Sequence, residues 1–152
     1  MAENIKKLGF VVKSSDRKKS PGATKRRDKS KSFPEQPKLL AVLHYHQRPG
    51  CHPTPATFKN GEQCFELVTS GRGWVEIKGK WIEVNPGDLL WHRPGDWTIG
   101  RSDFQHPYSC LAVRFYDPAM KLPRVPRITR WEELDEVKRF TGEVVRLHAD
   151  DS

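Results

Sequence analysis

Four side chains in the middle of the chain have types and spacing suited to binding a small polar molecule. His44 and His46, in "LHYHQ", are two positions apart, so a strand would place both imidazoles on one face. Glu66, in "CFELVTS", and Tyr108, before "SCLAVRFY", add a carboxylate and an aromatic ring. Ligand hydroxyls need polar partners of this kind, and an aromatic face packs on C–H groups. We therefore take these four residues as candidate ligand-binding residues and predict that one ligand contacts Glu66, Tyr108 and one of His44 or His46.

Each of these residues also has a purely structural interpretation. A histidine pair on one strand is often a pocket wall or a hydrogen-bonded core group, and Tyr108 suits an ordinary core position. A buried Glu66 is costly unless it is hydrogen-bonded, so an internal donor such as a histidine, or a ligand hydroxyl, must satisfy it. Strand alternation predicts that Cys64 and Val68 share the face of Glu66.

The elements that must position these residues are short strands separated by Gly and Pro. Runs rich in Val, Ile, Trp and Phe predict strands over 39–47, 64–70, 73–79, 80–85, 88–93 and 109–116. A tight hairpin is expected at Lys78-Gly79, and "NPGD" at 85–88 predicts a turn. Closely spaced strands of this kind are typical of a closed barrel or jelly roll, which leaves few exposed sheet edges.

After the last predicted strand the sequence changes to a helical period. Thr129 with Glu132 three residues later predicts a capping box, so we expect a helix over 129–149 that Gly142 weakens or breaks. Its apolar stripe either packs on the outside of the barrel or meets a second subunit. The stripe consists of Trp131, Leu134, Val137, Val144 and Leu147.

The N-terminal segment differs from the rest in charge. Residues 1–38 carry twelve Lys or Arg against four Asp or Glu, which accounts for the whole net charge of +8. With few large apolar groups, residues 1–37 are expected to be a disordered basic tail before a β-barrel over 38–128. The tail is either an arm that attracts nucleic acid or a solvating leader. The apolar run 8–12 is too short for a signal peptide or a membrane span, which indicates a cytoplasmic protein without membrane contact.

Two motifs of the predicted barrel resemble the paired motifs of the cupin superfamily. In "ELVTSGRG" six residues separate Glu66 from Gly73, and "PGDLLWHRPGDWT" has Gly87 and Gly95 at the spacing of the second motif. More narrowly, residues 39–148 resemble the sugar-binding and dimerisation domain of AraC-type transcriptional regulators. The resemblance implies an all-β, cupin-like double-stranded β-helix, or jelly-roll barrel, with a C-terminal helix. It also implies that Glu66 points inward and that Tyr108 lies near a bound sugar.

The histidines that bind metal in cupins are missing from these motifs. The stretch before Glu66 is "NGEQCF", and Thr98 stands where the last metal ligand is expected. A threonine hydroxyl is a poor ligand for divalent transition metals, and the chain has no Gly-x-Ser-x-Gly nucleophile motif. We therefore expect no metal or other cofactor and no enzymatic activity. The alternative is a small stand-alone cupin enzyme, an isomerase or a metal-dependent oxygenase, with His44 and His46 as metal ligands.

The function implied by the resemblance is ligand sensing in transcriptional regulation. In AraC-type regulators helix-turn-helix units follow the sensor domain, whereas this sequence ends at Ser152, so any DNA contact is expected from an absent or partner domain. The expected partners are a small polar ligand such as a sugar and a second copy of the chain, bound through the C-terminal helix.

Overall fold

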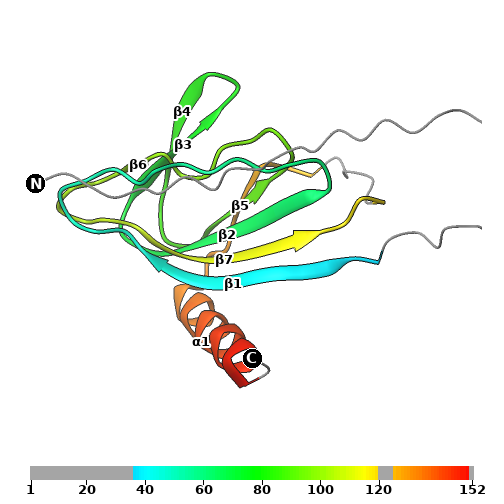
Figure 1. Cartoon of the computed structure of the whole chain (residues 1–152). Coiled ribbons are helices and arrows are strands. Elements are labelled where there is room, and N and C mark those ends of the chain that lie inside the picture. Colours follow the sequence, from blue (N-terminus) through cyan, green and yellow to red (C-terminus); the bar gives the residue numbers. More distant parts are fainter. Residues whose placement is uncertain (1–35, 120–124, 151–152) are drawn as a thin grey trace, which may run out of the picture. The chain divides into compact units, whose positions relative to one another are not determined.

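In a computed structural model of the protein, two antiparallel β-sheets and one helix form the part that the structure describes, residues 36–119 and 125–150 (Figure 1). Nearly all of the predicted tail lies outside the described residues. The larger sheet has the order β1-β7-β2-β5-β8, made of β1 (Lys38–His46), β2 (Glu62–Ser70), β5 (Asp88–His92), β7 (Ser109–Tyr116) and β8 (Ile128–Arg130). The smaller sheet has the order β4-β3-β6, made of β3 (Gly73–Ile77), β4 (Lys80–Val84) and β6 (Arg101–Ser102). The helix α1 spans Leu134–Asp150.

This mostly β architecture with a C-terminal helix confirms the main features of the predicted fold class. The six predicted strands are present with bounds within two residues, whereas β6 and β8, of two and three residues, were too short to predict. The ladders belong to two separate sheets, and much of the chain between β5 and β7 is irregular. The structure therefore shows two sheets and does not show the closed barrel.

Two predicted turns are present and need unusual backbone angles. Lys78 and Gly79 have φ angles of 52° and 76°, which a two-residue hairpin loop requires. Gly87 has a φ of 92°, and a Cβ there would lie 2.4 Å from the carbonyl oxygen of Trp131, so only glycine fits without strain. The N–H of Gly87 donates to Val68 and its carbonyl accepts from Trp131. This turn therefore joins β2 to the segment before α1.

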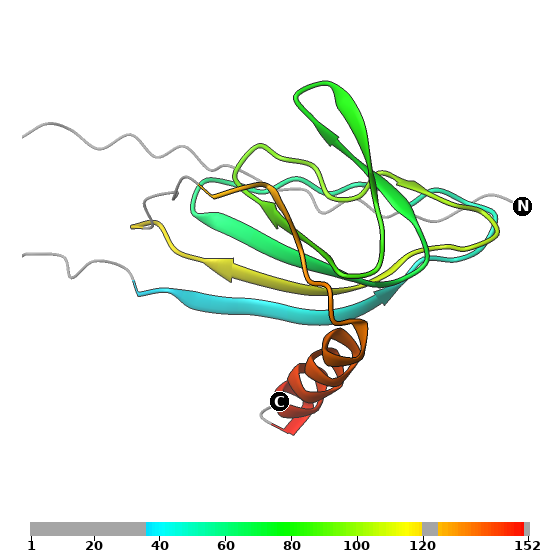
Figure 2. The same ribbon diagram turned by 180° about the vertical axis from the view of Figure 1, so that it is seen from behind.

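Both faces of the larger sheet are covered. On its inner face, Val68 and Leu90 pack with Val75 of the smaller sheet. On its helix face, Leu67 packs with Val137 of α1, and Figures 1 and 2 show α1 on this side of the sheet. Because neighbouring side chains of a strand point to opposite faces, β2 contributes to both layers.

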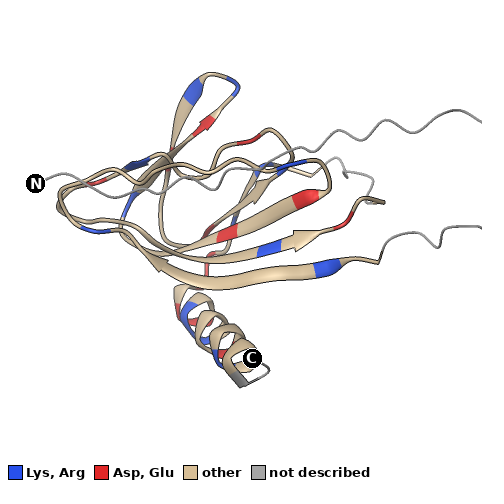
Figure 3. Ribbon diagram, viewed as in Figure 1, with Lys and Arg blue, Asp and Glu red and all other residues tan. Residues whose placement is uncertain are grey.

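The predicted capping box is wrong, because Thr129 lies in β8. Thr129 pairs with Leu89 of β5, and the partly buried Ile128 beside it packs against the core. Extending the sheet satisfies backbone groups that a helix end would leave unpaired, so the helix begins only at Leu134. Gly142 does not break α1, which carries both signs of charge along its length (Figure 3). No helix within the described residues is long and apolar enough to cross a membrane.

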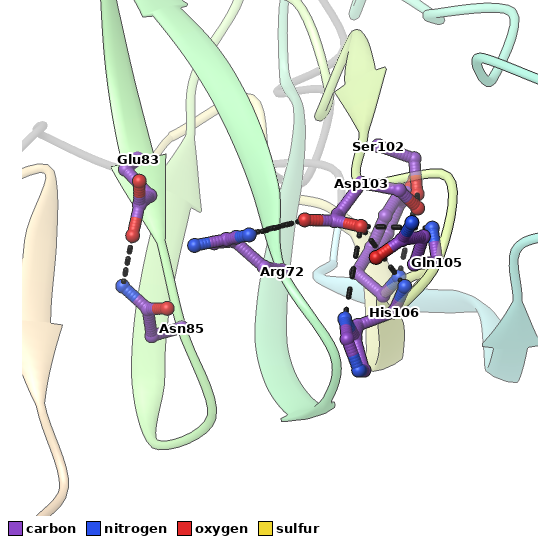
Figure 4. Close-up of polar contacts among 8 residues, drawn as sticks. Arg72, Glu83, Asn85, Ser102, Asp103, Gln105 and His106 are labelled. Carbon is purple, nitrogen blue, oxygen red and sulfur yellow. Dashed lines mark hydrogen bonds and ion pairs between the residues drawn. The ribbon is translucent and has the colours of Figure 1, made fainter.

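A network around Asp103 holds the chain where it enters β7 (Figure 4). The Asp103 carboxylate accepts hydrogen bonds from the N–H groups of Gln105 and His106, at 2.8 and 2.9 Å, and from the Arg72 guanidinium. The Arg72 side chain, followed by these N–H groups, lowers the pKa of Asp103 to about 2. The Arg72 N–H also donates to the carbonyl of His106. The network therefore fixes the turn that precedes Tyr108.

Replacing Asp103 with Asn should lower the melting temperature at neutral pH and weaken its dependence on acid. The folded pKa of about 2 lies below the ordinary value of 3.8, so the ionised carboxylate stabilises the fold above about pH 4. This contribution is lost as the pH falls through about 2. Thermal melts of both proteins from acid to neutral pH measure the difference, with Glu143→Gln on the exposed side of α1 as the control. A difference that stays constant down to the acid limit would contradict this role.

Candidate functional site

A cavity of about 180 Å³, here called the inner cavity, lies against the inner face of the larger sheet. Loop residues from the 53–58 and 98–99 segments complete its wall. Because side chains alternate along a strand, each of three neighbouring strands contributes two side chains to the inner cavity. They are Leu43 and Tyr45 of β1, Cys64 and Glu66 of β2, and Ala112 and Arg114 of β7.

Glu66 lies in the wall of the inner cavity and is paired with His92. Oε2 of Glu66 lies 2.8 Å from Nε2 of His92, and the two residues are only 6% and 3% exposed. In the ladder between β2 and β5, Glu66 is opposite Leu90 and Cys64 is opposite His92. The acid and the imidazole are therefore diagonal neighbours on one face, and the imidazole supplies the hydrogen bond that a buried carboxylate needs.

Tyr108 lines the same cavity. It is buried, and its ring centroid lies 5.6 Å from that of Tyr45. Burial, followed by the nearby Glu66 carboxylate, raises the pKa of Tyr108 well above its ordinary value. The phenol therefore stays protonated at neutral pH and can donate a hydrogen bond. The structure thus brings Glu66 and Tyr108 together in one cavity.

Arg114 adds a cation to the inner cavity. It lies opposite Cys64 in the ladder between β2 and β7, and its guanidinium carbon is 5.5 Å from the ring centroid of Phe58. One terminal nitrogen lies 3.6 Å from Oε2 of Glu62. The Nε atom is buried and has no hydrogen-bond partner among the described residues. Because an unpaired buried donor is costly, a ligand acceptor would be stabilised at this atom.

Thr98, which replaces the last metal ligand of the cupin motif, holds the loop over the cavity. Its hydroxyl accepts a hydrogen bond from the N–H of Ala56 at 2.9 Å, and its own N–H donates to the Ala56 carbonyl at 3.0 Å. Thr57 and Trp97 form an isolated bridge next to these bonds. The Thr98 side chain therefore fastens the segment that carries Phe58.

His44 and His46 lie on the helix face, away from the inner cavity. Nε2 of His44 is 3.3 Å from Oγ1 of Thr69, and Nδ1 of His46 is 2.9 Å from Oγ of Ser109. Both histidines line a different cavity, next to α1.

We predicted that one of these histidines contacts a ligand together with Glu66 and Tyr108, but the structure does not bring the three into one cavity. Leu43 and Tyr45 occupy the inner-face positions of β1, so alternation sends His44 and His46 to the opposite face. The alternation itself was visible in the sequence, but which of its two sets faces inward was not.

The fold and the cavity agree with a comparison against known protein families. The model of the AraC-like ligand binding domain matches residues 42–122, which is more than half of the chain. The chain belongs to this family. The match confirms the resemblance to AraC-type sensor domains and includes the strands that line the inner cavity of this AraC-like domain. No curated protein matches the sequence.

The two buried cysteines of the AraC-like domain, Cys64 and Cys110, do not have the properties of nucleophiles. Burial, followed by the charge of Glu66, raises the pKa values of Cys64 and Cys110 well above the ordinary thiol value. The thiolate is the reactive form of cysteine, so both thiols are unreactive at neutral pH. In the described part of the chain, no three His, Cys, Asp or Glu side chains are grouped as a metal site.

Sequence reasoning missed two residues of the inner cavity, Tyr45 and Arg114, and it missed His92 as the partner of Glu66. Each lies in a predicted strand, two positions from an apolar residue that faces the same way. A polar residue in such a run was the available signal, but it does not give the strand pairing. The partnership of His92 with Glu66 depends on the register between β2 and β5.

Replacing His92 with Leu should destabilise the domain by about 3–5 kcal/mol, because the Glu66 carboxylate would be left buried without its partner. Replacing Glu66 with Gln should cost less, since an amide oxygen still accepts a hydrogen bond. In the double variant Glu66→Leu with His92→Leu neither partner is left unpaired, so it should be more stable than His92→Leu alone. Urea unfolding measures all three free energies. A double variant less stable than His92→Leu would show that the pair does not act as argued.

Proposed function

We propose that this AraC-like domain is a sensor that binds a small polyhydroxylated ligand, a sugar or sugar acid, in the inner cavity. The observation that carries the proposal is the meeting of a carboxylate, a phenol and a guanidinium on one cavity wall, from Glu66, Tyr108 and Arg114. A purely structural core would be lined by Val, Leu and Ile. The cavity also has the aromatic surface that packs against the C–H groups of a sugar.

Hydrogen-bonding capacity at Glu66 supports a ligand with hydroxyl groups. An ionised carboxylate offers about four acceptor sites, and the hydrogen bond with His92 uses one of them on Oε2. The phenol of Tyr108, which also has a side-chain hydrogen bond with Tyr45, adds a hydroxyl to the same space. Ligand hydroxyls, which both donate and accept, match these two groups.

The position of Arg114 favours an acidic member of this ligand class. Its buried Nε has no partner among the described residues, and a carboxylate oxygen forms a stronger hydrogen bond with a guanidinium than a hydroxyl does. A uronic acid combines this carboxylate with the hydroxyls that suit Glu66 and Tyr108. We therefore rank uronic acids above neutral pentoses and hexoses.

A thermal-shift screen of pentoses, hexoses and uronic acids tests the proposed ligand class. A ligand present at about a hundred times its dissociation constant should stabilise the fold by about 2.7 kcal/mol. Arg114→Gln should weaken a uronic acid more than a neutral sugar, because it removes the charge and leaves much of the side-chain volume. Glu66→Gln should weaken both.

Lys80→Gln removes a charge from the exposed hairpin and serves as the matched control. No shift with any compound, or equal shifts in wild type, Arg114→Gln and Glu66→Gln, would rule out the inner cavity as the site.

The same proposal includes a cytoplasmic role in transcriptional regulation. It is supported by membership of the AraC-like family. In this view any DNA contact is made by another domain or by a partner chain, and ligand occupancy in the inner cavity is the signal passed to it.

We also propose that the domain forms a homodimer through α1. Val137 is buried against the sheet, whereas Leu134, Phe140 and Leu147 are 40%, 42% and 50% exposed. The apolar residues of the helix thus cover the sheet and also leave large side chains at the surface. A symmetric dimer brings the same surface of both helices together, which fits the dimerising role of this region in the family.

Replacing Leu147 with Lys should convert such a dimer to a monomer, because in a symmetric interface the new charge lies near its own copy. Half of the Leu147 side chain is exposed, so the fold should be retained. Sedimentation measures the mass and circular dichroism checks the fold. Ile82→Lys makes a similar change on the exposed part of β4 and should leave the mass unchanged. A wild type that sediments as a monomer at high concentration would rule out the dimer.

A further inference from the structure

A second cavity, of about 360 Å³, lies between the helix face of the larger sheet and α1; we call it the helix-side cavity. Seven of its nine lining residues carry hydrogen-bonding side chains, and none of the nine is an acid. The sheet contributes His44, His46 and Ser109, and α1 contributes Lys138, Thr141 and Gly142. The proposed sensor function makes no use of this cavity.

The two imidazoles form one wall of the helix-side cavity. Their ring centroids are 4.3 Å apart, and each has one ring nitrogen near a hydroxyl, Thr69 for His44 and Ser109 for His46. Partial burial, and then the neighbouring His46, lowers the pKa of His44. Each of these contacts involves one ring nitrogen. The same contacts leave the second nitrogen of each ring to a ligand.

Thr141 of α1 also lines this cavity, and its hydroxyl is unsatisfied. The residue is 4% exposed, and its Oγ1 atom is buried without a hydrogen-bond partner among the described residues. Threonine is also a weaker helix former than alanine. Neither helix propensity nor an internal hydrogen bond therefore explains this side chain, whereas a ligand acceptor would satisfy it.

Gly142 keeps space open beside Thr141. It lies inside α1, where glycine is less favourable than alanine. A Cβ at this position would meet no atom within 4 Å, so close packing does not require glycine. The missing side chain adds to the volume of the helix-side cavity.

Lys138 gives the cavity its charge. Its Nζ atom lies 3.6 Å from a carboxylate oxygen of Asp135, and both side chains are largely exposed, so this pair is weak. Hydroxyl, imidazole and ammonium donors without a lining carboxylate form a surface that favours an anion over a cation.

We propose that the helix-side cavity binds a tetrahedral oxyanion of the phosphate type, either free or as the phosphate group of a small monoester. The donors come from both walls, so the anion would bridge α1 to β1 and β7. Thr141 would donate to one phosphate oxygen, the histidines to others, and Lys138 would offset the charge.

Isothermal titration calorimetry with inorganic phosphate and with phenyl phosphate tests this site. Neither probe carries the sugar hydroxyls expected in the inner cavity. Thr141→Val keeps the shape and removes the donor, so it should weaken binding about tenfold or more while raising the melting temperature of the ligand-free protein. Gly142→Leu should fill the cavity and abolish binding. Glu143→Leu adds the same side chain at an exposed neighbouring position outside the cavity and should leave binding intact.

The two probes distinguish the source of the anion. Equal affinity for both indicates free phosphate, and tighter binding of phenyl phosphate indicates a monoester. Arg114→Gln should change neither affinity, because Arg114 lines the inner cavity. The anion site and the sensor proposal can therefore be tested independently. The site is ruled out if neither probe binds at millimolar concentration, or if Thr141→Val and Gly142→Leu both bind like the wild type.

Discussion

The larger sheet is covered on both of its faces, and every assignment in this domain depends on that constraint. A strand covered on one side sends its polar residues to water, but β2 and β7 lie between two layers. Alternation therefore sorts neighbouring residues between two buried regions. Tyr108 lines the inner cavity, and the next residue, Ser109, lines the helix-side cavity. Buried polar residues on either face need hydrogen-bond partners. In the described structure, each cavity is lined by a residue with a buried polar atom that has no such partner.

The pairing of Glu66 with His92 is the clearest solution to this constraint. A carboxylate in a buried layer is costly unless a partner is fixed beside it. The register of β2 with β5 supplies that partner from within the same sheet, so the acid is held before any ligand arrives. A preformed acceptor of this kind reduces the ordering that a ligand must impose on binding. A glutamate here is thus compatible with both structure and recognition.

The sequence predicted the strands better than it predicted which strands pair and which layer covers each face. Alternating apolar runs and the turn at Lys78-Gly79 depend on local chemistry, so the strands were found within two residues. Thr129 had a local capping signal, but pairing with the edge of β5 prevailed because it depends on a distant segment. Of the predicted site, Glu66 and Tyr108 share a cavity, while His44 and His46 lie on the other face. Strand order and the layer that covers each face are tertiary properties, which no single run of residues contains.

The same alternation that separates the two cavities also connects them. At the end of β1, His46 pairs with Ser109, and the N–H of the following Gln47 donates to the carbonyl of Tyr108 at 3.0 Å. One short stretch of ladder therefore carries a wall of each cavity. Because α1 meets the sheet at the helix-side cavity, the backbone between Tyr108 and Ser109, like that on either side of Tyr45, joins a wall of one cavity directly to a wall of the other.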